Sequence, residues 1–363
     1  MGIFQLLRNA RGTDRFIKAQ NAKPHPDTCV IVGNGPSLQP AVVAAINRAE
    51  ADVYISNFAY ENPLLFERAN VLGMVNPLVI EQAVDGLEQC YTVARAAGQS
   101  VPTLLLPESL SGQMPAVAAP HGVATAATPG FQLHPIRGAS TQSTVTYFLL
   151  QIAFWVGYKR VTLIGVDNTY NQPPVAEGVV ITQVAADVNH FSADYFRGRR
   201  WEAADTQRMA AVISLAASAY LSHGRALTNS TVGGALDVLP RESLGEVLKK
   251  SEFGAVPAAL NRGESLCLYV RSLLSVLRSR RMIGMTLLTG VVLAMASVML
   301  PLSGISAAWI RTIVLGAALC GFLVMLTVGA RLWERNVEVA NLREFERRSQ
   351  VMASSNSDPN VPG

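Results

Sequence analysis

The stretch CVIVGNGPSL, residues 29–38, indicates the class of fold. An apolar, β-branched run stops abruptly at residues 33–37, and a helix-like pattern follows at 39–49. This order is typical of a buried strand that turns directly into a helix in an α/β protein. Gly33 and Gly35 permit close backbone approach, and amides at a helix start favour phosphate, although the loop is not GxGxxG. Alone, the stretch fits a structural turn as well as the floor of a nucleotide site.

The same alternation of short apolar runs and longer helical patterns continues to about residue 255. It predicts strands at 28–33, 52–56, 71–75, 103–107, 160–166 and 226–231, and helices at 39–49, 78–97, 141–156 and 203–222. The Pro-, Ala- and Gly-rich segment 107–130 is expected to be an irregular connection with some strand content. Residues 28–255 are therefore predicted to form a Rossmann-like parallel sheet with helices on both faces, after an N-terminal extension at 1–27.

The composition changes at Met282. Half of the 363 residues are hydrophobic, 15% are charged and the mean hydropathy is +0.26, which indicates membrane-embedded length. Residues 282–310 and 312–330 contain no charge, and each stretch has about the 20 residues that cross a bilayer as a helix. We expect a C-terminal two-helix transmembrane hairpin (282–300 and 312–330) after a basic linker helix at 256–281. Two buried core helices are the alternative.

Charged residues around this hairpin predict its orientation. Arginines lie before the first span and after the second: Arg271, Arg278, Arg280, Arg281, Arg331, Arg335, Arg343, Arg347 and Arg348. The loop between the spans carries only Arg311. The positive-inside rule then puts the 28–255 domain and the tail on the cytoplasmic side of the cytoplasmic membrane. Residues 331–363 are expected to form an amphipathic helix, suited to the lipid surface or to a homo-oligomer, and a disordered tail.

Charge and cysteine spacing argue against nucleic-acid binding and against a metal site built from cysteines. The net charge is only +4, and no dense Lys/Arg patch is interleaved with aromatic residues, so nucleic-acid binding is not expected. The four cysteines are far apart and lack metal-ligand spacing, which suits reduced thiols in the cytoplasm.

Polar residues follow several of the predicted strands. In a doubly wound sheet, ligands bind at the carboxyl ends of the strands, so these residues are candidate ligands. Asn57 and Asn76 could each hold a ribose or a base, or cap the next helix. Thr144 opens a helix, as a cap or as part of a phosphate cradle. Asp167 and Tyr170 follow the strand at 160–166. Because no second carboxylate lies near Asp167, no metal site is expected.

The segment NHFSADYFRGRRW, residues 189–201, holds the densest group of reactive side chains. His190 could act as a general base, with Asp194 and Tyr195 orienting it. A purely structural role is the alternative for a lone histidine. Three arginines in the segment could neutralise phosphate: Arg197, Arg199 and Arg200.

In this order along the chain, GNGPSL, SNFAYE, VNPLVIEQ and GYKRVTLIGVDNTY resemble the motifs of bacterial CMP-sialic-acid-dependent sialyltransferases. The first loop, the GVD strand end, and the NHF…DYF and NSTVGG segments also resemble 6-hydroxymethylpterin diphosphokinase-like proteins. The resemblance covers about residues 28–240. It implies a Rossmann-like domain with a small lid and a site that needs no metal.

The sialyltransferase resemblance also implies roles for single residues. The activated nucleotide would be contacted by Asn34 and Ser37. The cytidine would be held by Asn57 and Asn76, and the phosphate or the sugar carboxylate by Thr144. Tyr170 would hydrogen-bond the leaving phosphate, and His190 would be the base, with Asp194 or Tyr195 as the alternative base position.

Three functions follow from these observations. The favoured one is a membrane-anchored glycosyltransferase that needs no cofactor. Its donor would be a nucleotide sugar, preferably a CMP-sugar with a sialic-acid-like sugar, and its acceptor a glycan or a lipid-linked glycan. An ATP- and Mg²⁺-dependent diphosphokinase-like enzyme, with Asp167 on the metal, and a non-catalytic membrane scaffold are the alternatives. The candidate site comprises the catalytic residues His190, Asp167 and Tyr170 and the donor-binding residues Gly33, Asn34, Gly35, Ser37, Asn57, Asn76 and Thr144.

Overall fold

The computed structural model describes residues 13, 15–22, 24–126, 130–173 and 178–254. The predicted linker helix, membrane hairpin and tail, at 256–363, lie outside these residues. Within the described part of the chain, no helix combines the length and the apolar character needed to cross a membrane.

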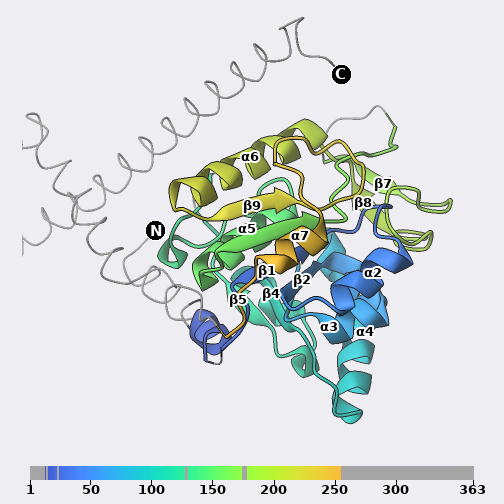
Figure 1. Ribbon diagram of the computed structural model, residues 1–363. Coiled ribbons are helices and arrows are strands. Elements are labelled where there is room, and N and C mark those ends of the chain that lie inside the picture. The colour runs from blue at the N-terminus through green and yellow to red at the C-terminus, as the bar shows by residue number, and fades with distance from the viewer. Residues whose placement is uncertain (1–12, 14, 23, 127–129, 174–177, 255–363) are drawn as a thin grey trace, which may run out of the picture. The chain divides into compact units, whose positions relative to one another are not determined.

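Seven parallel strands form the central sheet, which confirms the predicted α/β fold (Figure 1). In spatial order they are β5 (His121–Val123), β4 (Thr103–Pro107), β3 (Val71–Gly73), β2 (Asp52–Ser56), β1 (Thr28–Val32), β6 (Arg160–Ile164) and β9 (Ala226–Asn229). The chain moves outward from β1 to β5 on one side and then returns to add β6 and β9 on the other side. The strand order therefore reverses between β1 and β6. Val32 pairs with Ile164, so these two strands end level with each other.

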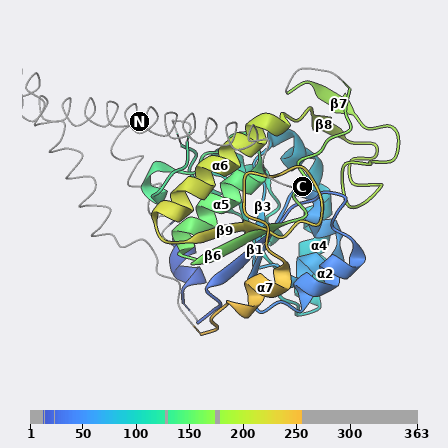
Figure 2. The same cartoon turned by 45° about the horizontal axis from the view of Figure 1, so that its top comes forward.

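Helices cover both faces of the sheet. They are α2 (Pro40–Asn47), α3 (Pro63–Arg68), α4 (Pro77–Ala96), α5 (Val145–Val156), α6 (Thr206–Ser222) and α7 (Leu244–Lys249). Figure 2 shows α5 and α6 on one face, and α2 and α4 on the opposite face. Alternate residues of β1 enter two separate apolar clusters, with Val30 and Val32 in one and Cys29 and Ile31 in the other. A strand buried on both faces is apolar throughout, which is the pattern of residues 29–32.

Helix α5 is buried along its whole length. All twelve of its residues lie below the surface, and its one amide side chain, Gln151, bonds to backbone groups of Gln132, Ser140 and Tyr147. Gly157 ends the helix at a φ of +108°, a conformation that glycine adopts without a steric penalty. Because α5 leads into the start of β6, its N-terminus lies toward the carboxyl ends of the strands.

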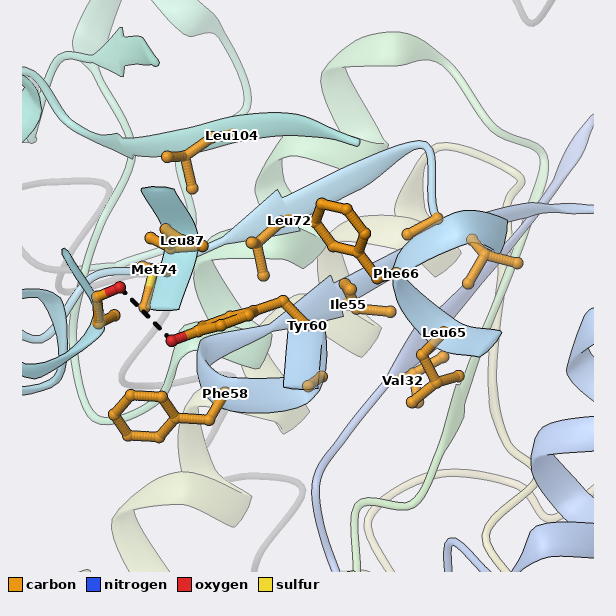
Figure 3. Packing of buried hydrophobic residues seen from close by; sticks show 14 of the residues in the cluster. Val32, Ile55, Phe58, Tyr60, Leu65, Phe66, Leu72, Met74, Leu87 and Leu104 are labelled. Atoms are coloured by element: carbon orange, nitrogen blue, oxygen red, sulfur yellow. Dashed lines mark hydrogen bonds between the residues drawn. The ribbon is translucent and has the colours of Figure 1, made fainter. Parts of the chain in front are cut away.

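A short 3₁₀ helix, η1 (Asn57–Glu61), connects β2 to α3. Figure 3 shows Phe58 and Tyr60 of this helix among apolar side chains of the sheet and α4, where the Tyr60 hydroxyl donates to the carbonyl oxygen of Ala83 at 3.4 Å. Because Asn57 is the first residue of η1, this packing fixes its position at the end of β2.

Residues 178–203, called here the β7–β8 segment, lie outside the main sheet. They contain the antiparallel pair β7 (Val180–Thr182) and β8 (Arg200–Glu202). The side-chain amide of Gln82 exchanges two hydrogen bonds with the backbone of Arg200, at 2.8 and 2.9 Å. Arg199 lies 4.1 Å from the centre of the Phe58 ring. The segment is therefore anchored to α4 and η1.

Candidate functional site

Two adjoining cavities lie at the carboxyl ends of the strands, where the strand order reverses between β1 and β6. The inner one, of about 90 Å³, lies between the loops that follow these strands, and the outer one, of about 370 Å³, is bordered by the starts of α4, α5 and α6 and by β8. The residues that line both are Asn57, Thr144, Val145, Tyr170, His190 and Met209. This is the position at which open α/β sheets bind ligands.

The two glycines of the first loop serve to pack it against the loop after β6. The amide of Gly33 donates to the carbonyl oxygen of Ile164 at 2.7 Å, and that of Gly35 donates to Gly165 at 2.8 Å. A Cβ atom at Gly35 would lie 1.8 Å from Oδ2 of Asp167. The amides of Gly33 and Gly35 are therefore engaged within the protein and are not free to bind a phosphate.

Asp167 is held in place from two sides and is only 8% exposed. Its Oδ2 accepts a hydrogen bond of 2.7 Å from the Ser37 hydroxyl. Its carbonyl oxygen accepts another, also 2.7 Å long, from the amide of Ala235, in the loop after β9. Asp167 lines the inner cavity, whereas Ser37 lines neither cavity. The two hydrogen bonds of Asp167 connect the loops that follow β1, β6 and β9.

Asn34 and Asn57 each place a buried, unpartnered oxygen at the inner cavity. The side-chain nitrogen of Asn34 donates to the carbonyl oxygen and the hydroxyl of Ser56, at 3.2 and 3.0 Å. Its Oδ1, like that of Asn57, is buried and has no hydrogen-bond partner among the described residues. A buried acceptor without a donor is costly, so both oxygens suit a ligand that carries hydroxyl or amino groups.

Asn76 and Thr144 both act as helix caps at the outer cavity. Oδ1 of Asn76 accepts from the amide of Leu78 at 2.8 Å, and Oγ1 of Thr144 accepts from Thr146 at 3.3 Å. The side-chain nitrogen of Asn76 donates to Glu202 of β8 at 2.9 Å. The capping alternative is therefore confirmed for both residues, and both also line the outer cavity.

Unusual backbone conformations gather around the cavities. Among the described residues, Asn57, Ala119, Ser143 and Asn168 are the non-glycine residues with positive φ, between +46° and +60°. All except Ala119 line a cavity, and Oγ of Ser143 is buried without a partner in the described structure. Such strained residues are typically found at ligand sites, where the surrounding structure enforces them.

His190 lies against both cavities with one ring face covered. Its side chain is 10% exposed, and its Nδ1 lies 2.8 Å from Oδ2 of Asp187. The ring stacks on Tyr195 at a centroid distance of 4.2 Å and an interplanar angle of 4°. Tyr195 thus supports His190 as expected, whereas Asp194 is 75% exposed and pairs with Arg197 instead. Because this segment turns back on itself, the carboxylate beside His190 comes from three residues upstream.

Tyr170 lines both cavities, and its hydroxyl is protonated at neutral pH. Burial is the main cause that raises its pKa to about 12, and the nearby carboxylates of Asp187 and Asp167 raise it further. Its ring meets His190 edge to face, at 6.2 Å, and stacks on Trp201 at 6.3 Å. At neutral pH the group is therefore a hydrogen-bond donor.

The candidate phosphate-binding arginines do not line either cavity. Each pairs with a carboxylate outside them: Arg197 with Asp194, Arg199 with Glu61, and Arg200 with Glu81. The described residues of the two linings include no lysine or arginine. In the described chain, no three His, Cys, Asp or Glu residues are grouped so that they could hold a metal ion. The N-termini of α4, α5 and α6, which border the outer cavity, supply positive partial charge there.

Three contributors to this site were not named individually from the sequence: Asp187, Ser143 and Trp201. Only Asp187 had a readable signal, because DVNH places a carboxylate three residues before the histidine. Comparisons of the chain with protein-family models, curated proteins and solved structures give no match.

Proposed function

We propose that the chain is a membrane-anchored glycosyltransferase that binds a nucleotide sugar, preferably a CMP-sugar, in the joined cavities. The observation that carries the proposal is the convergence of polar side chains from several strand ends on the same cavity. Polar side chains from the ends of β1, β2 and β6 meet at the strand-order reversal, beside a histidine whose Nε2 has no hydrogen-bond partner in the described structure. The outer cavity is within the usual size range of small-molecule sites.

The polar groups fit a nucleoside monophosphate. The unpartnered oxygens of Asn34 and Asn57 would accept hydrogen bonds from ribose hydroxyls or the base amine. The phosphate would lie at the N-terminus of α5, near the Tyr170 hydroxyl. A CMP-sugar has a single phosphate charge, whereas diphosphate donors have two and more often need cationic side chains or metal ions. The absence of Lys and Arg from the described linings favours the former.

The chemistry requires one proton acceptor and one group that stabilises the departing phosphate. His190 Nε2 would remove the proton from the acceptor hydroxyl, a step that typically contributes about 10²–10⁴ in rate. Tyr170 would donate a hydrogen bond to the phosphate as the glycosidic bond breaks. Asp167, held by Ser37, keeps the first loop in place for this arrangement.

The acceptor and the membrane part of the proposal rest on sequence. If residues 282–330 form the predicted hairpin, the enzyme and a lipid-linked glycan acceptor are confined to one cytoplasmic surface. The diphosphokinase-like alternative would need Asp167 as a metal ligand, but in the described chain no group of three His, Cys, Asp or Glu residues is arranged to hold a metal ion with it. The transferase is therefore the better supported of the two.

Donor turnover tests the proposal. The purified full chain is incubated with CMP-, UDP- and GDP-sugars, with and without EDTA, and released nucleotide is measured. We expect turnover of one donor class, preferably the CMP-sugar, unchanged by EDTA and at least about 100-fold slower in His190→Ala. Turnover of no donor contradicts the proposal. A parallel incubation with ATP and Mg²⁺ tests the diphosphokinase-like alternative, which is supported by AMP release that disappears with EDTA.

A further inference from the structure

The contact between Asp187 and His190 carries information about which ring nitrogen holds a proton. Asp187 is almost fully buried, with its side chain 2% exposed, and its Oδ1 accepts a hydrogen bond of 2.8 Å from the amide of Asn189. Its own amide donates to the carbonyl oxygen of Ala193, also at 2.8 Å. The carboxylate is therefore held in one orientation before any ligand binds.

The charge of Asp187 follows from the same contacts. Burial raises the pKa of this carboxyl, but the hydrogen bond and charge of His190 and the amides of Asn189 and Phe196 lower it more, and the net pKa is below its ordinary value. At neutral pH Asp187 is thus a carboxylate, which can only accept hydrogen bonds. The hydrogen of the 2.8 Å contact then belongs to Nδ1 of His190.

The other side of the ring faces the cavities. In the described structure Nε2 has no hydrogen-bond partner, and His190 lines both cavities. With a hydrogen on Nδ1, the neutral ring has its lone pair on Nε2. Stacking on Tyr195 prevents the ring from tilting away from this orientation.

We propose that Asp187 is a positioning residue that holds His190 in the Nδ1–H form and directs the basic Nε2 toward the reacting groups. This inference rests on the proposed function and adds to it. Nε2 takes the proton of the acceptor hydroxyl as its oxygen bonds to the anomeric carbon. The bond from that carbon to the phosphate oxygen breaks, and its electron pair leaves with the nucleotide. Asp187 stabilises the imidazolium until the proton passes to water.

The first measurement needs neither a variant nor activity. The ¹⁵N shifts of His190 are recorded in full-length protein with ¹⁵N-labelled histidine at pH 7.5, and the signal is assigned by its loss in His190→Ala. We expect a protonated Nδ1 and an unprotonated Nε2. A ring that carries its hydrogen on Nε2 overturns the proposal.

The second measurement uses Asp187→Asn, which conserves shape but introduces an amide donor. The amide can donate to Nδ1 and move the ring hydrogen to Nε2, so kcat should fall by about 10²–10⁴ while the donor KM changes less than about threefold. Asp85→Asn, an exposed change of the same charge on α4, is the matched control and should have wild-type kcat.

The two measurements separate this inference from the proposed function. If His190 has the expected ring form but no nucleotide sugar is turned over, the proposed function is contradicted and the positioning by Asp187 is still supported. Wild-type kcat in folded Asp187→Asn, or the same His190 ¹⁵N shifts in that variant as in the wild type, overturns the positioning.

Discussion

Gly35→Ala tests how the floor of the site is built. The added Cβ would lie 1.8 Å from Oδ2 of Asp167 and 2.9 Å from the carbonyl oxygen of Gly165, whereas real Cβ atoms essentially never come within 3.0 Å of such atoms. Asp167 must then move by more than an ångström, which breaks its hydrogen bond with Ser37. Overpacking of this kind costs about 1–3 kcal/mol. In a domain of this size, each kcal/mol lowers the Tm by about 2–4 °C.

Thermal unfolding of the full chain measures this cost, with Gly245→Ala as the matched control. Gly245 lies in α7, and a Cβ there meets nothing within 4 Å, so its substitution should leave the Tm unchanged or raise it slightly. If Asp167 is the obstacle, Gly35→Ala combined with Asp167→Ala should be less destabilised than the sum of the single changes, by about 1 kcal/mol. An unchanged Tm in Gly35→Ala, or strict additivity in the double variant, would refute the reasoning.

Two further substitutions separate stability from ligand binding. Asp52 is the first residue of β2, at the opposite end of the strand from the cavities. It lies 2.8 Å from His25 and accepts a hydrogen bond of 2.5 Å from Tyr158, so Asp52→Asn should lower the Tm and leave the nucleotide affinity unchanged. Weaker nucleotide binding would contradict this. Burial raises the pKa of Asp27, but the amide of Glu252 and the Arg160 guanidinium outweigh it, and the net pKa is lowered. Asp27 therefore stabilises the fold above about pH 4 and loses this effect as pH falls through its folded-state pKa. Asp27→Asn should be less stable than the wild type at pH 7, and its free energy of unfolding, measured by urea titration, should fall less steeply below pH 4. An unchanged pH dependence below pH 4 would contradict this role of Asp27.

The fold could be predicted because its strongest signals are local. Strands such as β1 and β6 are buried on both faces, so each is a nearly continuous apolar run, and the intervening helices have lengths distinct from the strands. Strand β5 could only be expected as some strand content, because three residues with a glycine at the centre carry no periodicity. The C-terminal bounds of α5 and α6 were predicted correctly, whereas both helices begin later than predicted, directly after the caps Thr144 and Asp205.

The site was predictable where it depends on the sheet and less so where it depends on the β7–β8 segment. The rule that ligands bind at strand ends located Asn34, Asn57 and Asp167 correctly at one cavity. It did not reveal that the glycines pack two loops together, because that contact joins residues about 130 positions apart. The partner of His190 was missed for a different reason. Asp187 and Asp194 are both close to His190 in sequence, and only the folding of the segment places Asp187 beside the ring and turns Asp194 outward.

The central claim is that a nucleotide binds at the carboxyl ends of the strands, where the strand order reverses between β1 and β6. Calorimetric titration of the full chain with CMP tests it most directly. Asn57→Asp is the informative variant, because aspartate tolerates the φ of +50° and conserves shape but places a negative charge in a cavity lined by no described cation. The account predicts one CMP bound per chain and an affinity at least tenfold lower in Asn57→Asp, equivalent to about 1.4 kcal/mol. Absence of binding by CMP, UDP and GDP at millimolar concentration, or equal affinity in the variant, would contradict it.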